Sequence, residues 1–268
     1  MMIRSLAYDD RRLRDIGGEP LLATMVESAA RCCGMGLVYE FWGVYEGRRD
    51  RVPKGFILQK GHALWATALC PEAVPEIVDF LRWRQEGWVM LCPTLSAAWR
   101  QETGETGLSL AVMALPDTVS LPESYLPEAA YCPDTATAVA DCNLAVVELT
   151  PAQYETAVVN LHLAERRHVG YTVTLRQDGR AVSAAAVTDC GTRCGQISYV
   201  ATLPEYEGQG MGRAVVYRCA EWLRERGRTP LIACETHRES FYAGLGFEQV
   251  SCVTIFEAGQ AKKRNEEA

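Results

Sequence analysis

Residues 199–212 read YVATLPEYEGQGMG: a β-rich run, then Pro204, then three glycines at alternate positions, Gly208, Gly210 and Gly212. The residues that follow, 213–226, have a helical pattern. Glycines at the start of a helix leave backbone amides accessible, and the helix dipole favours an anion at that end. This stretch therefore predicts a strand–loop–helix unit that binds a phosphorylated cofactor.

The spacing of the glycines argues against two other phosphate-binding loops. A dinucleotide-binding turn needs G-x-G-x-x-G, but Arg213 fills the last position counted from Gly208. A Walker loop needs Lys and Ser/Thr after its last glycine, whereas Gly212 is followed by Arg213 and Ala214. A dinucleotide enzyme is therefore a disfavoured hypothesis, which NAD binding would revive.

The segment EGQGMG resembles the pyrophosphate loop of the GNAT superfamily, the acetyl-CoA-dependent N-acetyltransferases, whose pattern is Gln/Arg-x-x-Gly-x-Gly/Ala. Gly210 and Gly212 fill the two small-residue positions, and Glu207 departs from the pattern at the Gln/Arg position. Residues 235–250, ETHRESFYAGLGFEQV, are similar to the last helix and strand of the same superfamily, where a Tyr precedes a Leu-Gly-Phe turn. The resemblance covers residues 144–258.

The second half of the chain shows the element order α-β-β-β-α-β-α-β, which matches that superfamily. Thr150 and Gln153 form a capping box, which predicts a helix over residues 150–167. Asp178-Gly179 predicts a hairpin turn between antiparallel strands. The other predicted elements are strands at 196–203, 229–235 and 247–258 and helices at 213–226 and 239–246.

The first half repeats this order faintly, but its strand-to-helix junction differs. Residues 68–76 read ALCPEAVPE, with two prolines and no glycine, so this junction offers no comparable amide cradle. We expect a mixed α/β fold with a mostly antiparallel, GNAT-type sheet flanked by helices, as a tandem. The expected parts are a degenerate GNAT-like or generic α+β domain at 1–115, a linker at 116–143, the acetyltransferase domain at 144–258 and a tail at 259–268.

The resemblance implies roles for particular residues. Acetyl transfer needs a deprotonated amine, stabilisation of an oxyanion and a proton for the leaving thiolate. Tyr242 is the candidate acid, because a phenol has an ordinary pKa near 10 and stays protonated at pH 7; its alternative role is packing. The residues implied in cofactor binding are Val200, Ala201 and Thr202 on the strand, for the thioester and pantetheine, and Gly208, Gln209, Gly210, Met211, Gly212 and Arg213 at the pyrophosphate.

The general base is left open. In histone-acetylating members a Glu lies on the strand before the glycine loop, and its position here falls on Gln196, which cannot accept the proton. The remaining candidates are Asp189, Glu235, His237 and a chain of water molecules.

Composition limits the partners. The formal net charge of −7 argues against binding a phosphate backbone and is compatible with a cationic amine substrate. No apolar run approaches membrane-span length, and the charged start does not resemble a signal peptide, so we expect a cytoplasmic protein without a membrane partner. The eleven cysteines should be reduced thiols, and no His/Cys spacing predicts a metal site.

The sequence therefore predicts an acetyl-CoA-dependent N-acetyltransferase that acts on a small-molecule amine. The alternative, prompted by Glu207 and Gln196, is a non-catalytic acyl-CoA-binding sensor or interaction protein.

Overall fold

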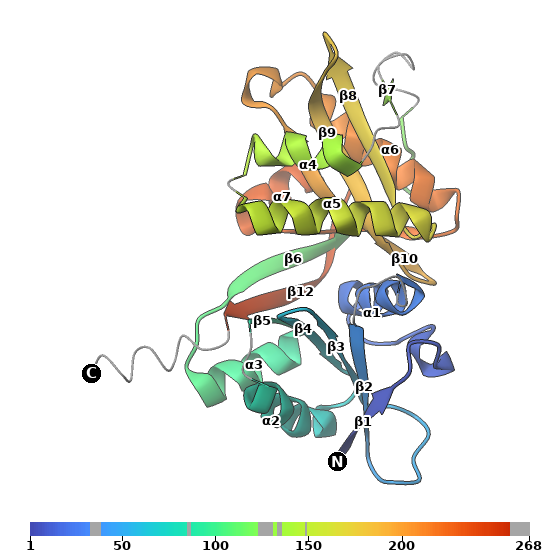
Figure 1. The fold of residues 1–268 in the computed structure, drawn as a ribbon, viewed down its shortest axis with the longest axis vertical. Coiled ribbons are helices and arrows are strands. Elements are labelled where there is room, and N and C mark those ends of the chain that lie inside the picture. Colours follow the sequence, from blue (N-terminus) through green and yellow to red (C-terminus); the bar gives the residue numbers. More distant parts are fainter. Residues whose placement is uncertain (33–38, 85–86, 123–130, 133–135, 148, 258–268) are drawn as a thin grey trace, which may run out of the picture. The chain divides into compact units, whose positions relative to one another are not determined.

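The computed structural model describes residues 1–32, 39–84, 87–122, 131–132, 136–147 and 149–257, drawn as coloured ribbon in Figure 1. The chain divides into two compact units. Unit 1 comprises Met1–Val112, Ala233–Glu239 and the described part of Gln249–Ala268, and unit 2 comprises Met113–Ile232 and Ser240–Glu248. Each unit is therefore assembled from segments that are distant in the sequence.

The sheet of unit 1 has the strand order β1-β2-β3-β4-β5-β12-β6. Neighbours from β1 to β4 are antiparallel, β4 and β5 are parallel, and β12 is antiparallel to β5. The parallel pair needs a crossover connection, which helix α2 supplies. The strands are β1 Met2–Leu6, β2 Tyr39–Tyr45, β3 Gly55–Lys60, β4 Ala63–Ala68, β5 Trp88–Leu91, β6 Leu108–Ala114 and β12 Glu248–Glu257.

Three helices pack on this sheet: α1 (Pro20–Cys32), α2 (Val74–Arg84) and α3 (Pro93–Thr103) all contact β4. Gly55 allows α2 to approach β3, because a Cβ atom there would lie 2.8 Å from Cδ1 of Ile77. The apolar faces of strands and helices thus meet in one core. Its fully buried members include Leu21, Leu22, Ile57, Ile77, Leu81, Val89 and Leu91.

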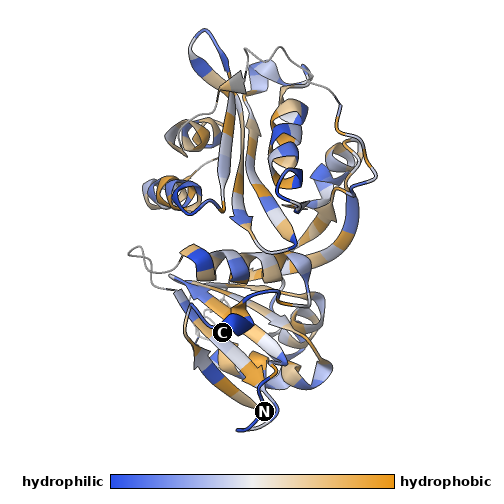
Figure 2. Cartoon of the chain, turned by 90° about the vertical axis from the view of Figure 1, so that its right-hand side faces the viewer, coloured by the Kyte–Doolittle hydropathy of each residue, from blue (hydrophilic) through white to orange (hydrophobic). Residues whose placement is uncertain are grey.

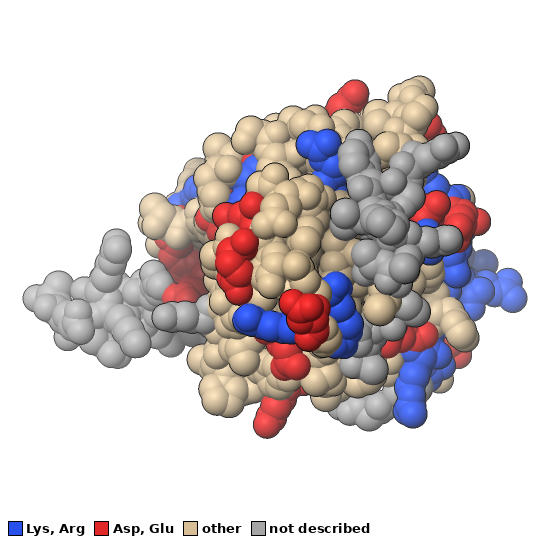
Figure 3. Space-filling view, turned by 90° about the horizontal axis from the view of Figure 1, so that it is seen from above, with Lys and Arg blue, Asp and Glu red and all other residues tan. Residues whose placement is uncertain are grey.

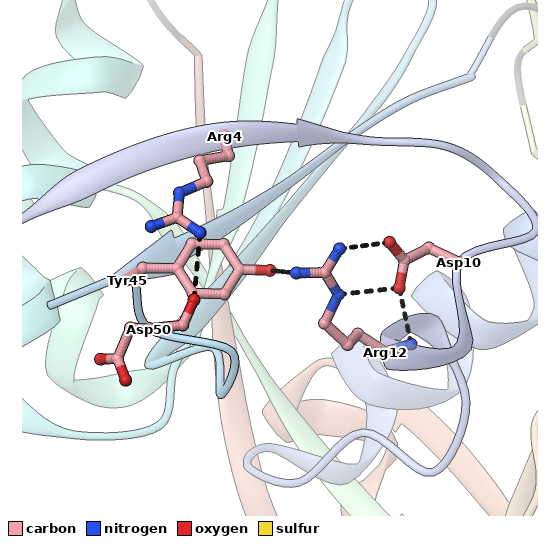
Figure 4. A network of polar contacts seen from close by, with 5 residues as sticks. All are labelled: Arg4, Asp10, Arg12, Tyr45 and Asp50. Carbon is pink, nitrogen blue, oxygen red and sulfur yellow. Dashed lines mark hydrogen bonds and ion pairs between the residues drawn. The ribbon is translucent and has the colours of Figure 1, made fainter. Parts of the chain in front are cut away.

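A buried tyrosine ties the edge of this sheet together (Figure 4). The hydroxyl of Tyr45 accepts a hydrogen bond of 2.7 Å from Arg12, whose guanidinium also pairs with Asp10 and lowers the pKa of that carboxyl by hydrogen bonding. The guanidinium of Arg4 lies 4.3 Å from the centre of the Tyr45 ring, a cation–π contact, and donates to the backbone carbonyl of Asp50. These contacts join β1, β2 and the segment before α1.

The sheet of unit 2 has the strand order β11-β10-β9-β8-β7. Strands β7 to β10 are antiparallel to their neighbours, and β10 and β11 are parallel and joined through helix α6. The strands are β7 Tyr131–Cys132, β8 Tyr171–Gln177, β9 Arg180–Cys190, β10 Cys194–Thr202 and β11 Thr229–Cys234.

Helices cover both faces of this sheet. Helices α4 (Ala136–Leu144) and α5 (Pro151–Arg166) lie on one face and α6 (Met211–Arg224) on the other, as the two views of Figures 1 and 2 show. Figure 2 also shows hydrophobic and hydrophilic residues interspersed along these elements. Gly195 makes the α6 contact possible, since a Cβ atom there would lie 2.2 Å from Leu223. Helix α7 (Thr236–Ala243) follows β11.

The predicted fold class is confirmed, and so is much of the local structure. The capping box of Thr150 and Gln153 forms at the start of α5. Asp178 and Gly179 adopt positive φ angles of 51° and 81° in the β8–β9 hairpin, as a two-residue turn of this type requires.

The units differ from the continuous domains that we predicted in two respects. Helix α4 lies within the segment 116–143, which we predicted as a linker, and it packs on β9 and β10. The closing strand, predicted within the domain 144–258, pairs with β5 at Thr254↔Leu91, so the chain from Gln249 onward belongs to unit 1. A residue pattern indicates that a strand forms, but pairing depends on partners far away in the sequence.

Candidate functional site

The glycine loop forms the predicted strand–loop–helix junction. After β10, residues Pro204–Tyr206 form one turn of 3-10 helix, and Gly210 caps α6 with a φ of 80°. The first hydrogen bond inside α6 runs from the Ala214 N–H to the Gly210 carbonyl, at 3.1 Å. The amides of Met211 and Gly212 therefore precede the hydrogen-bonded ladder, at the helix end where the dipole favours an anion.

The side chains of the loop leave this end of α6 open. Glu207, Gly208, Gln209 and Gly210 are exposed, and Gln209 folds back, donating through its side-chain amide to the Glu205 carbonyl at 3.3 Å. Arg213 is also exposed, on the first turn of the helix. The backbone amides of the predicted loop residues are thus in place for an anionic group.

Gly212 joins the two sequence motifs in space. A Cβ atom at Gly212 would lie 3.1 Å from Oγ1 of Thr202, at the end of β10, and 3.7 Å from Cζ of Phe241 on α7. The Thr202 hydroxyl is held by Ser183, at 2.9 Å between the hydroxyl oxygens. A side chain at Gly212 would therefore crowd the Thr202 hydroxyl, whereas its distance from Phe241 would be that of an ordinary van der Waals contact.

Strand β10 carries a β-bulge directly before the loop. Ser198 pairs with Ala186 and Ala201 pairs with Ala184, so three steps along β10 match two along β9. Tyr199 absorbs the extra residue with a φ of 53°. Bulges turn backbone groups out of the regular ladder and are frequent beside active sites. Val200, Ala201 and Thr202, the predicted strand residues, are the three that follow Tyr199.

A buried amide holds this bulge. Asn143, at the end of α4, is 8% exposed and donates through Nδ2 to the carbonyl oxygens of Tyr199 at 2.8 Å and of Val139 at 3.0 Å. We did not single out Asn143 or Tyr199 from the sequence. The left-handed backbone of a bulky residue carries no signal of its own in the sequence, and an Asn near a helix end is more commonly a cap.

Burial, with the nearby charge of Asp189 as a smaller cause, raises the pKa of Tyr199. The phenol therefore stays protonated at neutral pH.

Tyr242 lies on α7 and is 8% exposed. Its ring contacts those of Phe241, at 5.0 Å between ring centres, and Phe247, at 6.0 Å, both edge to face. The Leu-Gly-Phe turn folds back on it, because the amides of Leu245 and Phe247 both donate to the Tyr242 carbonyl, at 3.0 and 3.1 Å. The Leu-Gly-Phe turn thus holds Tyr242 in place. These contacts are compatible with the alternative role of Tyr242 as a packing residue.

The candidates for the base fall into two groups. Asp189 on β9 lies directly opposite Gln196 on β10, and both are partly buried. Within the described residues, Oε1 of Gln196 is buried without a hydrogen-bond donor. Glu235 and His237 face each other at 3.7 Å in unit 1, and both side chains are more than half exposed. Asp189 thus lies opposite Gln196, the strand position at which histone-acetylating members carry a Glu.

The corresponding junction of unit 1 lacks the glycine-loop geometry. After β4, a 3-10 turn at Pro71–Ala73 leads into α2, and Pro75 occupies its first turn. Pro71 and Pro75 have no backbone N–H to offer an anion. The two junctions therefore differ as the sequence predicts: the junction before α6 has a glycine cap, and the junction before α2 has prolines.

No cluster of three or more His, Cys, Asp or Glu side chains suited to a metal ion occurs among the described residues. Ten of the eleven cysteines are described, and all ten are thiols; Cys33 lies outside the described residues. Cys190 and Cys194 flank the β9–β10 turn, where the Gly191 amide donates to the Cys194 carbonyl at 2.9 Å. These two cysteines therefore lie at the two ends of a hairpin turn.

Figure 3 shows basic and acidic side chains close to one another on the face it presents. A backbone-binding protein instead clusters Lys and Arg. Among the described residues, none of the helices combines the length and hydropathy of a membrane span. The expected absence of nucleic-acid and membrane partners stays a prediction.

Comparisons with known proteins agree with this geometry. The family model described as "Acetyltransferase (GNAT) family" matches residues 139–247, a range that begins within α4 and ends at Phe247. It includes the bulge, the glycine loop and Tyr242. No curated protein matches the sequence.

Solved structures share the fold at low identity. The chain is similar to a tandem GNAT protein from the clavulanic acid biosynthesis pathway, solved without AcCoA, at 16% identity over 96% of this chain and 98% of that chain, with a TM-score of 0.60. A GCN5-related N-acetyltransferase from Kribbella flavida matches at 17% identity over 89% and 94% of the two chains, with a TM-score of 0.57. An acetyltransferase from the GNAT family from Colwellia psychrerythraea matches at 12% identity over 96% and 100%, with a TM-score of 0.58.

The family match and the shared fold support acyl transfer in general. Residues 139–247 of this chain therefore match the model of the GNAT acetyltransferase family.

Proposed function

We propose that this protein is an acetyl-CoA-dependent N-acetyltransferase that acetylates a primary amine on a small molecule. The observation that carries the proposal is the junction at Gly210 and Gly212. There a left-handed glycine cap begins α6, and the absence of a Cβ atom at Gly212 lets the Thr202 hydroxyl lie close to the helix start. An anionic cofactor bound at this junction would lie near Phe241, the neighbour of Tyr242.

The residues present fit acetyl-CoA. The open space at Gly208 and Gly210, where a Cβ atom would meet nothing within 4 Å, together with amide donors at a helix N-terminus, suits a diphosphate. The amides from Gly208 to Arg213 would bind the diphosphate, and Val200, Ala201 and Thr202 after the bulge would bind the arm and the thioester. Bound acetyl-CoA supplies the acetyl group as a thioester. Glu207 is exposed on the same loop and stays compatible only if its carboxylate points into solvent.

Protons are moved by side chains of unit 2. Tyr242 is the proposed acid and would hold the phenolic proton for the leaving sulfur, and the N–H groups at the bulge would be the donors to the thioester oxygen. Gln196 has no useful basicity, so the amine loses its proton to water. Asp189, directly across from Gln196, is the nearest carboxylate on the paired strand to accept that proton from the water.

The acceptor is expected to be a small amine, since the chain has a formal net charge of −7 and its amine substrates would be cations. We also propose that the protein is cytoplasmic. A second candidate function, a non-catalytic acyl-CoA sensor, is favoured by Glu207 on the loop and by Gln196 in place of a strand carboxylate.

One experiment separates the two functions. Purified protein is incubated with acetyl-CoA and a panel of small primary amines, and free CoA and acetylated amine are measured by chromatography. Amine-dependent formation of both products supports the enzyme. Saturable CoA binding without turnover for any amine supports the sensor, and the absence of CoA binding overturns both. The Gly210→Val variant should lose turnover and binding together, because a side chain there would strain the left-handed cap and obstruct the amides.

A further inference from the structure

Unit 1 contains a cavity that the proposed function does not use. It has a volume of about 620 Å³ and lies between helix α2, the edge strand β1 and its neighbour β2. This volume lies within the usual range for small-molecule sites. Every residue that lines the cavity belongs to unit 1, so the cavity is complete within one compact unit.

The walls of the cavity are aromatic and acidic. Trp42 on β2 contacts Phe80 on α2 at 5.1 Å between ring centres, and Phe80 contacts Trp83 at 6.1 Å. Glu76 and Asp79 lie on the same helix, four residues before Phe80 and Trp83 respectively, so these four side chains share one stripe of α2. Aromatic faces and carboxylates together form an environment that favours a cation.

The chain already places two of its own cations in this cluster. The amino group of Met1 lies 3.5 Å from Oε2 of Glu76, and the guanidinium of Arg84 lies 5.3 Å from the centre of the Trp42 ring. Asp79 is exposed, and Trp83 is 74% exposed although it is a tryptophan. Trp83 continues the aromatic cluster of Trp42 and Phe80, and an exposed apolar patch with a polar rim is typical of a ligand-binding surface.

From these observations we propose that this cavity binds an organic cation, an ammonium group carried on a small apolar body. Asp79 supplies the charge partner, because Glu76 faces the Met1 amino group. Phe80 and Trp83 supply the aromatic surfaces, and Ile3 on β1 contributes to the apolar floor. This proposal does not depend on acetyl transfer, so a test of the site gives its result whether or not unit 2 is active.

The test uses choline as the probe and 3,3-dimethylbutan-1-ol, its neutral isostere, as the matched control ligand. The full chain carries its tag at the C-terminus, so that Met1 keeps its amino group, and is labelled with ¹⁵N. The indole N–H signals are followed by NMR during titration, and single Trp→Phe variants assign them. Choline should shift the Trp42 and Trp83 signals saturably and leave Trp222 unchanged. The alcohol should bind at least about fivefold more weakly.

Two variants locate the site. Asp79→Asn removes the charge and keeps the shape, and it should raise the dissociation constant of choline about threefold to tenfold; Trp83→Ala should do the same. Both side chains are exposed, so folding is not at risk. Asp117→Asn is the control, since that side chain is 84% exposed in unit 2, and binding should not change. Equal affinity for the alcohol, shifts spread over all indole signals, or unchanged binding in both cavity variants would overturn the proposal.

Discussion

The side-chain amide of Asn143 donates a hydrogen bond of 2.8 Å to the carbonyl oxygen of Tyr199, the residue whose φ of 53° forms the bulge in β10. Helix α4 thereby holds the strand that leads into the glycine loop. A left-handed backbone at a bulky residue costs about 1–3 kcal/mol and persists only where its surroundings fix it. Asn143 is the buried group that fixes it here.

We expect Asn143→Ala to destabilise the protein by about 1–3 kcal/mol, because the partly buried carbonyl of Tyr199 loses its donor. CoA affinity should fall as well, since Val200 to Thr202 follow the bulge. Urea unfolding and a CoA titration measure the two effects. Asn160→Ala, on α5, is the control and should change stability by no more than about 0.5 kcal/mol. An unchanged unfolding midpoint in Asn143→Ala would show that the bulge does not depend on this amide.

The glycine cap allows a matched pair of substitutions. Gly210 at the start of α6 and Gly227 just beyond its end have φ angles of 80° and 64°, and a Cβ atom would meet nothing within 4 Å at either position. Alanine at either position should cost about 1–2 kcal/mol of stability through backbone strain alone. Only Gly210→Ala should also weaken CoA binding, by about tenfold or more, in calorimetric titration. Equal loss of CoA affinity in Gly227→Ala would mean that strain, not the cradle, is responsible.

The number of CoA sites follows from the two junctions. Because Pro71 and Pro75 remove amide donors from the junction in unit 1, we expect one CoA per chain, bound by unit 2. Calorimetry with protein of known active concentration measures this ratio. Two equivalent sites per chain would contradict the assignment of unit 1 as the half that does not bind the cofactor.

Local structure could be predicted from the sequence because its signals are local. The capping box at Thr150, the Asp178-Gly179 turn and the glycine spacing at Gly210 each involve residues a few positions apart. The antiparallel pairing of β12 with β5 and the bond from Asn143 to Tyr199 link residues 56 or more positions apart, and no periodicity encodes them. For the same reason the proximity of Phe241 to Gly212, which brings the two motifs near one another, required the structure.

The pH dependence of stability can be tested at Cys142, which is 3% exposed. Burial raises the pKa of its thiol from 9.0 to about 11. As pH rises from 9 to 11, the unfolded chain loses this proton while the folded chain keeps it. The unfolded state therefore binds fewer protons, and stability falls by at most about 1.4 kcal/mol per pH unit.

Urea unfolding at several pH values should show a shallower fall of stability with pH in Cys142→Ala than in the wild type. Cys252→Ala, at a partly exposed position, is the control. The same slope in Cys142→Ala and the wild type would exclude this thiol as a cause.

Tyr242→Phe tests the proposed acid most directly. The change removes one hydroxyl and preserves the ring contacts with Phe241 and Phe247. If the phenol delivers the proton to the leaving thiolate, kcat should fall by about 10- to 1,000-fold with little change in CoA affinity. Tyr217→Phe is the matched control, because the Tyr217 hydroxyl donates to the Leu245 carbonyl at 3.1 Å and has a structural role in the same turn.

The comparison of these two variants distinguishes chemistry from packing. A structural role for both hydroxyls predicts similar losses in thermal stability and similar, small effects on kcat. A proton-donating role predicts a large loss of kcat in Tyr242→Phe alone, at unchanged stability. Single-turnover measurements are needed, because slow product release would hide a change in the chemical step. A single-turnover rate in Tyr242→Phe within about twofold of the wild type would reject the acid role and leave Tyr242 as a packing residue of the Leu-Gly-Phe turn.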